Sequence, residues 1–428
     1  MRVFLLSTGT ELLVGDVREA HLSFIAREIL PLGLRIEEQR VVGDGPQIRD
    51  ALEQLFARSE ILFVTGGLGP TSDDLTCELV GQSLGLKVER NATLLANLKR
   101  RFQERGMKWN DRVAKQADVP SGGEILANKN GSAPGFYLKA NINPAIASPH
   151  IFVLPGPPGE LQPMFRESVM SILRGIIGAP AIDRRLYKIA SVGESTIEQA
   201  VGDKVLAIPG VELGYCARPG EVDVRIIGAP NAIARADEII RNELGSSIFS
   251  SNDESLEQVL VKLLTKRKQT LSIAESCTGG LLANRITNVP GSSEVFLAGY
   301  VCYSNEAKID ILAVDAQLLE KHGAVSEPIA RAMAEGARKR ARSTYALATT
   351  GIAGPSGGSE EKPAGTVYIA LAAAEGQTKV ERRFYPNERE TFKQLVAQAA
   401  FEMLRRALLE SSKFQAPNSK EAPSSNIQ

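Results

Sequence analysis

The 428-residue chain has few of the residues that build disulfide frameworks and soft metal sites. It contains four cysteines and three histidines, His21, His150 and His322. The cysteines, Cys77, Cys216, Cys277 and Cys302, are widely spaced, and no two form a Cys-x-x-Cys pair. This spacing argues against a disulfide framework and against a thiolate zinc site. A metal bound by this chain would therefore be a hard cation held by carboxylates.

An excess of charge of either sign is also absent. Lys and Arg number 50, Asp and Glu number 50, and the formal net charge is +0. A surface that binds nucleic acid or an anionic membrane needs a basic excess. Aromatic residues make up only 5% of the chain, which leaves few platforms for base stacking. We therefore expect no direct binding of nucleic acid.

Long apolar runs are missing as well. None approaches the ~18 residues needed to cross a bilayer. The run Val3–Leu6 is too short for the core of a signal peptide, because Ser7, Thr8 and Gly9 interrupt it. We expect a soluble, cytoplasmic protein without membrane contact.

The sequence does contain the alternation typical of an α/β fold. The hydrophobic fraction of 43% is ordinary for globular proteins, and the length predicts two to four domains of roughly 100–200 residues. Apolar runs at Val3–Ser7, Leu34–Val42 and Ile61–Val64 are separated by segments with helical spacing of apolar residues. This βαβαβ order predicts a doubly wound parallel sheet covered by helices on both faces.

Between residues 172 and 250 the predicted strands and helices alternate at shorter intervals. A strand at Arg185–Ser191 and a helix at Glu194–Val201 precede two alternating runs, Glu212–Ala217 and Glu221–Ile227. A Pro-Gly turn between the two runs predicts a β-hairpin. This segment is therefore predicted to form a small α+β linker module.

A second α/β domain is predicted at residues 251–410. Its strands are expected at Leu271–Ala274, Val295–Tyr303, Tyr345–Thr350, Gly365–Ala372 and Lys379–Tyr385, and its closing helix at Arg389–Glu410. The full division is 1–171, 172–250 and 251–410, followed by residues 411–428. That last segment is rich in Ser, Pro, Asn and Lys and is predicted to be a disordered tail.

The first loop of interest, Thr65–Thr76, follows a buried strand. Its glycines Gly66, Gly67 and Gly69 would let backbone N–H groups approach a phosphate. The adjacent carboxylates Asp73 and Asp74 would repel that phosphate unless a divalent cation lay between them. The loop predicts a phosphate or pyrophosphate site of the Mg²⁺ type; alternatively, one of the aspartates only caps the following helix.

The second loop, Ala274–Gly280, also follows a strand. Ser276 could act there as a nucleophile, but no histidine is placed for a Ser-His-Asp triad. The nearest candidate base is Lys308, because a desolvated lysine can lose its proton near neutral pH. Cys277 is a rival nucleophile, since a thiol beside a helix N-terminus can be acidified. In the structural alternative, Ser276 or Thr278 caps a helix and Lys308 is solvated.

A third loop, Thr350–Gly358, lies just past another strand. Three polar loops that carry glycine at strand ends predict a ligand cavity.

With these motifs the chain resembles the bacterial CinA family of competence/damage-inducible proteins, from Val3 to about Leu408. The segments Gly66–Thr76 and Leu154–Pro158 resemble its N-terminal domain, which is similar to molybdopterin-binding MoaB/MogA-type domains. The segments that resemble its C-terminal amidase domain, a three-layer α/β domain, are Ala274–Gly280, Tyr303–Lys308, His322–Glu327, Thr350–Gly358 and Glu361–Thr366.

For the C-terminal domain the resemblance implies deamidation of nicotinamide mononucleotide to nicotinate mononucleotide and ammonia, without a cofactor. It implies Ser276 as nucleophile, with Tyr303 and Lys308 as the polar partners that activate it. The substrate-binding residues expected there are Thr278, Gly279, Gly280, Thr350, Gly351, Gly354 and Arg389.

For the N-terminal domain the resemblance implies an ADP-ribose pyrophosphatase that yields AMP and ribose 5-phosphate. Asp73 and Asp74 would hold Mg²⁺ or Co²⁺, and the residues expected to bind substrate are Gly66, Gly67, Gly69 and Thr71. The middle segment resembles the KH-like linker of the family, whose usual assembly is a homodimer.

The chain departs from the family pattern at three places. Arg18-Glu19-Ala20-His21 stands where an Asn-Thr-Asn-like stretch is usual, Cys77 where a basic residue is common, and Asn387-Glu388-Arg389 where Gly-Asp-Arg is usual. An alternative function therefore stays open: a non-catalytic protein that binds a nucleotide or a pterin and recruits partners in competence or the DNA-damage response.

Overall fold

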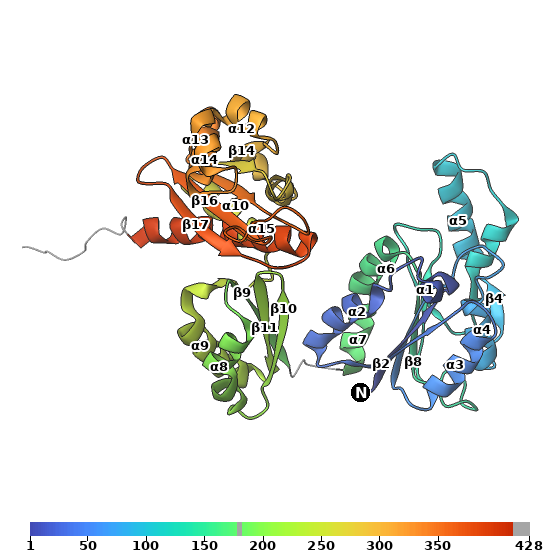
Figure 1. The fold of residues 1–428 in the computed structure, drawn as a ribbon. Helices are drawn as coiled ribbons and strands as arrows, with labels where there is room; N and C mark the ends of the chain where they lie inside the picture. Colours follow the sequence, from blue (N-terminus) through green and yellow to red (C-terminus); the bar gives the residue numbers. More distant parts are fainter. Residues whose placement is uncertain (178–181, 414–428) are drawn as a thin grey trace, which may run out of the picture. The chain divides into compact units, whose positions relative to one another are not determined.

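The computed structural model describes the backbone of residues 1–177 and 182–413, and side chains as far as residue 410 (Figure 1). The chain forms two compact units, Met1–Arg184 and a second unit from Arg185 onward.

The first unit is built on a six-stranded sheet in the order β2-β1-β3-β8-β7-β6. Its strands are β1 (Val3–Thr8), β2 (Ile36–Val42), β3 (Ile61–Thr65), β6 (Glu124–Leu126), β7 (Gly135–Leu138) and β8 (His150–Leu154). The pairs among β2, β1, β3 and β8 are parallel, as predicted for the first three of these strands. The sequence analysis missed β7 and β6, which pair antiparallel. Antiparallel neighbours need no crossover helix, so the sequence around these two strands has no βαβ pattern from which to predict them.

Helices cover both faces of this sheet, which confirms the doubly wound prediction. One core joins the sheet to α2, α6, η3 and α7, and a second core joins its other face to α3 and α4. Adjacent residues of one strand enter different cores: Leu5 faces α2, and Phe4 and Leu6 face α3. The helical segments of this unit are α1 (Thr10–Val14), α2 (His21–Ile29), η1 (Leu30–Leu32), α3 (Gln47–Phe56), α4 (Thr76–Ser83), α5 (Ala92–Glu104), η2 (Asp111–Ala117), α6 (Pro158–Met164), η3 (Phe165–Val169) and α7 (Met170–Ile177). A small separate ladder pairs β4 (Val88–Arg90) with β5 (Asp118–Pro120).

The second unit begins with a four-stranded sheet in the order β10-β11-β9-β12. Its strands are β9 (Asp183–Ala190), β10 (Glu212–Arg218), β11 (Glu221–Gly228) and β12 (Ile248–Ser250). The helices α8 (Glu194–Leu206) and α9 (Pro230–Leu244) pack on it with a core of their own, and η4 (Gly245–Ser247) precedes β12. The predicted hairpin is present, with Arg218 opposite Glu221 at its turn.

A five-stranded sheet follows, in the order β14-β13-β15-β16-β17. Its strands are β13 (Leu271–Glu275), β14 (Phe296–Val301), β15 (Tyr345–Gly351), β16 (Thr366–Ala373) and β17 (Lys379–Phe384). The first three pair in parallel, and β16 and β17 are antiparallel. All five predicted strands of this domain are confirmed.

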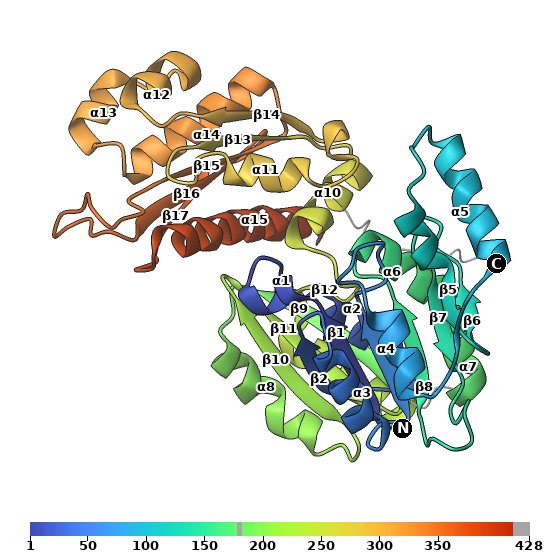
Figure 2. The same cartoon turned by 90° about the vertical axis from the view of Figure 1, so that its right-hand side faces the viewer.

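Helices lie on both sides of the five-stranded sheet, and Figure 2 shows it between α14 and α15. One core gathers α10 (Leu256–Arg267), α11 (Leu281–Thr287) and α15 (Arg389–Lys413), while the other gathers α12 (Asn305–Leu312), α13 (Ala316–His322) and α14 (Glu327–Ala341). A short turn, η5 (Ser292–Glu294), precedes β14. The predicted three-layer arrangement is therefore present.

Two predicted boundaries can be compared with these elements. The boundary at residues 171/172 falls within α7, whose Met170 and Leu173 lie in the core of the first unit. The closing helix continues to Lys413, so the predicted tail begins within it, and residues 414–428 lie outside the described part of the chain.

Two sequence-based exclusions can also be compared. All four cysteines are free thiols, as their spacing predicted. Within residues 1–177 and 182–413, no helix is both long enough and apolar enough to cross a membrane.

Candidate functional sites

A pocket of about 200 Å³ lies where the parallel strands of the five-stranded sheet end. Ser276 follows β13, Tyr303 and Lys308 follow β14, and Thr350 and Gly351 end β15. The pocket is lined by Ser276, Cys277, Tyr303, Lys308, Ala324, Val325, Thr350, Gly351, Ala353 and Arg389. Parallel neighbours end at the same sheet edge, and this brings together five of the predicted residues from three separate segments. The sixth, Arg389, comes from the start of α15 (Arg389–Lys413).

The loop that carries Ser276 is held by its own hydrogen bonds. The Ser276 N–H donates to the carbonyl of Thr349 on β15 (3.0 Å), and the Gly279 N–H donates to the carbonyl of Ser276 (3.2 Å). The buried hydroxyls of Thr278 and Thr349 are hydrogen bonded at 2.8 Å. Gly279 and Gly280 have φ values of 59° and 95°, which favour glycine. Thr278, Gly279 and Gly280 therefore shape this loop and do not line the pocket.

Lys308 is buried, with only 1% of the residue exposed. Its Nζ donates to the carbonyls of Tyr303 (3.1 Å) and Ser304 (3.3 Å). Burial lowers the pKa of the Lys308 ammonium, because desolvation disfavours the charged form. The alternative of a solvated Lys308 is wrong.

Tyr303 and Arg389 form a pair at the rim of the pocket. The Tyr303 side chain is exposed, and its hydroxyl accepts a hydrogen bond from Arg389 Nη2 (2.8 Å). Arg389 Nη1 donates to the carbonyl of Gly354 (3.2 Å), so Gly354 positions this guanidinium rather than lining the pocket. Tyr303 thus contacts Lys308 through its backbone carbonyl and Arg389 through its hydroxyl.

The expectation of an acidified Cys277 thiol is wrong. Cys277 is 4% exposed, and burial raises the pKa of its thiol to about 12. The helix N-terminus that was expected to acidify it is already used: the Glu275 carboxylate accepts hydrogen bonds from the N–H groups of Gly280 (3.0 Å) and Leu282 (3.1 Å). The Cys277 thiol is therefore protonated at neutral pH, and Cys277 only lines the pocket.

Sequence reasoning missed several residues of this site. Ala324 and Val325 line the pocket because Thr350 donates from Oγ1 to the Ala324 carbonyl (2.7 Å). Lys362 holds the same loop through the carbonyl of His322 (3.0 Å). Glu275 was also missed. A carboxylate at the end of a strand of buried residues could have been noticed, because a charged side chain is seldom buried unless other groups bind it.

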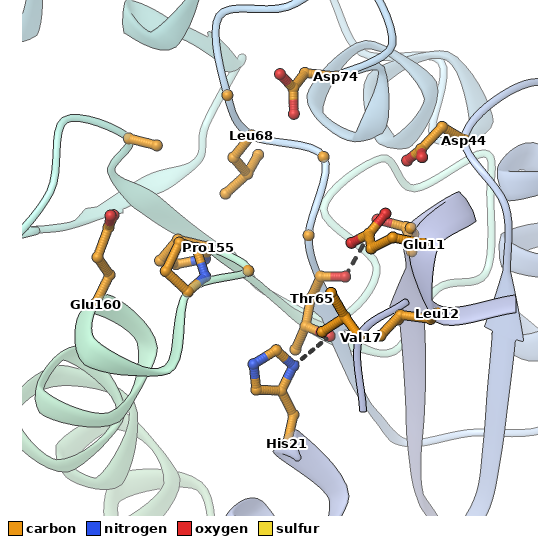
Figure 3. Close-up of a pocket in the computed structure, with 18 of the residues that line it drawn as sticks. Glu11, Leu12, Val17, His21, Asp44, Thr65, Leu68, Asp74, Pro155 and Glu160 are labelled. Carbon is orange, nitrogen blue, oxygen red and sulfur yellow. Dashed lines mark hydrogen bonds between the residues drawn. The ribbon is translucent and has the colours of Figure 1, made fainter. Parts of the chain in front are cut away.

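The first unit contains a larger pocket of about 540 Å³, where β1, β3 and β8 end. The predicted residues Gly66, Gly67, Gly69, Asp73 and Asp74 line it. Figure 3 shows further lining side chains, among them Glu11, His21, Asp44 and Glu160. A Cβ on Gly67 would lie 2.1 Å from Thr76 Oγ1, so the close approach of the loop to α4 requires glycine there.

The two predicted metal ligands differ in their surroundings. The Asp74 carboxylate accepts hydrogen bonds from the Thr71 N–H (2.9 Å) and from the Thr71 hydroxyl. These bonds hold together the loop that contains both residues. Thr71 is a partner of Asp74 and does not line the pocket. Asp73 is exposed and lines the pocket.

These residues do not form a ready metal cage. Among the residues that the structure describes, no group of three or more His, Cys, Asp or Glu side chains is arranged to hold a metal ion. Mg²⁺ commonly uses one or two carboxylates together with substrate phosphates and water. Asp73 fits a cation of that kind, one that enters with a phosphate-bearing substrate.

The departures at residues 18–21 and 77 fall in different places. Arg18, Glu19, Ala20 and His21 all line the large pocket. The His21 Nδ1 lies 3.2 Å from Thr65 Oγ1, and Figure 3 marks hydrogen bonds of this kind as dashed lines. Burial lowers the pKa of this imidazole. Cys77 does not line this pocket and instead donates from its thiol to the carbonyl of Asp118 (3.1 Å).

Fold and sites together define a protein with two α/β domains, each with a pocket at the ends of its parallel strands, and a small module between them in the sequence. Two family models match it: a probable molybdopterin binding domain over residues 4–175 and a CinA C-terminal domain over residues 253–408. The chain belongs to the CinA family, because relatives named for it match over nearly the full length.

Three relatives illustrate this similarity. A CinA-like protein of Akkermansia muciniphila is 40% identical over 401 residues, covering 94% of this chain and 96% of the relative. A competence-damage inducible protein of Caldicellulosiruptor bescii is 40% identical over 414 residues, covering 95% and 99%. A crystal structure of competence/damage inducible protein CihA from Agrobacterium tumefaciens is 41% identical, covers 38% of this chain and 99% of that one, and has a TM-score of 0.36.

Proposed function

We propose that the pocket of the C-terminal domain hydrolyses the carboxamide of nicotinamide mononucleotide, releasing ammonia and nicotinate mononucleotide. The observation that carries this proposal is the presence of Ser276 and the buried Lys308 on the wall of one pocket. A hydroxyl nucleophile beside a lysine with a lowered pKa is suited to attack an amide carbonyl. The names of the relatives state no activity, so the substrate is part of the proposal.

The proposed reaction proceeds in two stages. The neutral amine of Lys308 accepts the hydroxyl proton while Ser276 Oγ attacks the carboxamide carbon, and the same proton then leaves with the amide nitrogen as ammonia. Water then attacks the resulting ester: Lys308 takes one proton from this water and passes it to Ser276 Oγ as the ester bond breaks, and the released carboxylic acid loses the other proton to solvent. Among the described residues, the N–H group of Cys277, which lines the pocket, donates to no backbone acceptor, and we propose that it stabilises the oxyanion.

Arg389 is proposed to bind the 5′-phosphate of the substrate. The resemblance assigned Tyr303 to the activation of Ser276; we propose phosphate binding for its hydroxyl as well, because this hydroxyl is hydrogen bonded to Arg389 and the side chain is exposed. The guanidinium of Arg389 stands at the rim and uses one nitrogen for Gly354 and another for Tyr303. A guanidinium and a phenolic hydroxyl are both good partners for phosphate oxygens. The exposure of Tyr303 leaves this end of the pocket open to the bulky ribose phosphate.

Ammonia release tests the proposal directly. The full chain is incubated with nicotinamide mononucleotide, and ammonia and nicotinate mononucleotide are quantified. Ser276→Ala and Lys308→Met should each lose activity, whereas Lys321→Met, at an exposed lysine of α13, should retain it. The proposal fails if wild type releases no ammonia or if Ser276→Ala turns over at the wild-type rate.

A second activity, hydrolysis of ADP-ribose to AMP and ribose 5-phosphate, is proposed for the large pocket. The glycine loop at the end of β3 and the exposed Asp73 favour it, because together they can hold a pyrophosphate and its cation. AMP release is measured with Mg²⁺, with Co²⁺ and after chelation with EDTA. Nucleotide or pterin binding without AMP release under any of these conditions would instead support a binding domain that recruits partners.

A further inference from the structure

Glu275 is a fully buried carboxylate beside the proposed nucleophile. It ends β13, whose neighbours in the sheet are β14 and β15, and its exposed fraction is 0%. A buried carboxylate is costly unless other groups hydrogen bond to it. No cation within 4.0 Å pairs with Glu275 among the described residues, so its partners must be neutral donors.

Those donors are backbone N–H groups at the start of α11. Oε2 of Glu275 accepts from Gly280 (3.0 Å) and Leu282 (3.1 Å), and Oε1 accepts from Ala283 (2.9 Å). Helix N-termini leave their first N–H groups without intrahelical partners, and a carboxylate there is also favoured by the helix dipole. Glu275 therefore ties the end of β13 to the beginning of α11.

This tie encloses residues 276–280, the loop that carries Ser276. Within that loop, Ser276 and Gly279 use their N–H groups in backbone hydrogen bonds, and Gly280 donates to Glu275. Of the N–H groups of residues 276–280, those of Cys277 and Thr278 donate neither to a backbone acceptor nor to a Glu275 oxygen within the described part of the chain, and of these two residues Cys277 lines the pocket. Glu275 thereby fixes both ends of the segment that carries Ser276 and the N–H group of Cys277.

We propose that Glu275 is a positioning residue whose carboxylate holds the Ser276–Gly280 loop closed, so that the Ser276 hydroxyl and the N–H group of Cys277 act on one carbonyl. This inference rests on the proposed amidase function. It also assigns the α11 N-terminus to Glu275, which leaves the substrate phosphate to Arg389 and Tyr303 at the rim.

Glu275→Gln tests the positioning role, because the amide keeps the size of the side chain but replaces one acceptor oxygen with a donor. A misplacement of about 1 Å can cost about 100-fold in rate. We expect kcat for ammonia release to fall at least about tenfold while KM changes less than about threefold. The matched control is Glu402→Gln, at another buried glutamate of the same unit, which pairs with Arg405 and lines no part of the pocket.

A second readout separates this inference from the choice of substrate. A fluorophosphonate probe labels activated serines, and mass spectrometry locates the label. Labelling of Ser276 in Glu275→Gln should be at least about tenfold slower than in wild type, whatever the substrate is. Glu402→Gln should be labelled at the wild-type rate even if its Tm is lower.

Equal labelling rates in wild type and Glu275→Gln would overturn the positioning role. Slower labelling of the variant together with no ammonia release by wild type would overturn only the proposed substrate. Absence of labelling in wild type would remove Ser276 as nucleophile and the role of Glu275 with it.

Discussion

Lys308 shows how burial gives one residue its chemistry. The same side chain in solvent would be a charged ammonium at neutral pH. Here it is 1% exposed, its Nζ donates to two backbone carbonyls, and it lines the pocket that Ser276 also lines. Burial lowers its pKa, which makes the neutral amine available as a base.

Lys308→Met should lower kcat for ammonia release by a factor of about 100 or more, the usual contribution of a general base. In wild type, kcat/KM should rise with pH through the lowered pKa of Lys308 and level off below the ordinary lysine value of about 10.4. A pH profile from 6 to 10 measures this. A rise that continues up to the ordinary lysine pKa would contradict the assignment.

The same pKa shift has a consequence for stability. Because the folded state favours neutral Lys308, this contribution is fully present above the unfolded-state pKa and is lost as pH falls through the lowered folded-state pKa. The Tm difference between wild type and Lys308→Met should therefore move in favour of wild type as pH rises. Thermal unfolding at several pH values measures it, with Lys321→Met as the control.

Cys277→Ala should retain ammonia release within a few fold, because a thiol whose pKa is raised to about 12 is protonated at neutral pH. Iodoacetamide at pH 8 should leave Cys277 unmodified and alkylate Cys216, which is exposed. Peptide mass spectrometry distinguishes the two positions. Loss of activity in Cys277→Ala, with Ser276→Ala still active, would make the cysteine the nucleophile.

At the scale of elements, α15 contacts both the pocket and the small module within the second unit. Its first residue, Arg389, lines the pocket. Further along one face, Gln398 donates to Glu221 on β11 (3.0 Å), and Arg405 donates to the carbonyl of Ser246 (2.6 Å). Arg405 is also paired with Glu402 at 2.7 Å, and both side chains are 4% exposed.

Glu402→Ala should destabilise the protein by about 3 kcal/mol, because it leaves the buried Arg405 without its carboxylate. The matched control is Glu410→Ala, which removes an exposed partner of Lys379 on the same helix and should cost less than about 1 kcal/mol. Urea denaturation followed by circular dichroism measures both variants. Equal losses would show that Arg405 finds other partners.

At the scale of the whole molecule, the two candidate sites lie in different compact units. The chemistry of each pocket is supplied by loops of its own sheet. The neutral overall charge fits this division, because anion recognition is assigned to local groups such as Arg389 and the glycine loop. The homodimer implied by the family resemblance stays a proposal, which light scattering of the full chain can test.

The two proposed activities should be independently removable. Ser276→Ala should abolish ammonia release and leave AMP release unchanged, and Asp73→Asn should lower AMP release about tenfold or more and leave ammonia release unchanged. EDTA should act like Asp73→Asn, because only the large pocket is proposed to need a cation. Parallel assays of both products on each variant measure this, and a loss of both products in one folded variant would contradict independence.

The sequence by itself determined the elements and the loops that carry chemistry. Apolar runs of strand length alternate with helical spacing, and this predicted the parallel strands β1, β2 and β3 and all five strands of the C-terminal sheet. The motifs around Ser276, Lys308 and Asp73 were visible because they interrupt such runs with glycine and polar residues. Local pattern is sufficient for this, since side-chain period follows directly from backbone geometry.

Only the tertiary structure decided which of these residues meet and in what state. Residues 276, 308, 350 and 389 share one pocket because three parallel strands and the start of α15 converge, and no local pattern encodes that distance. Burial shifts the pKa values of two pocket residues in opposite directions: it lowers the pKa of Lys308 and raises the pKa of the Cys277 thiol. The hydrogen bonds of Glu275 to the start of α11 and of Asp74 to Thr71 likewise could not be predicted from the sequence. Hydrogen-bond partners and desolvation depend on the folded environment, which is why they follow from packing and not from spacing.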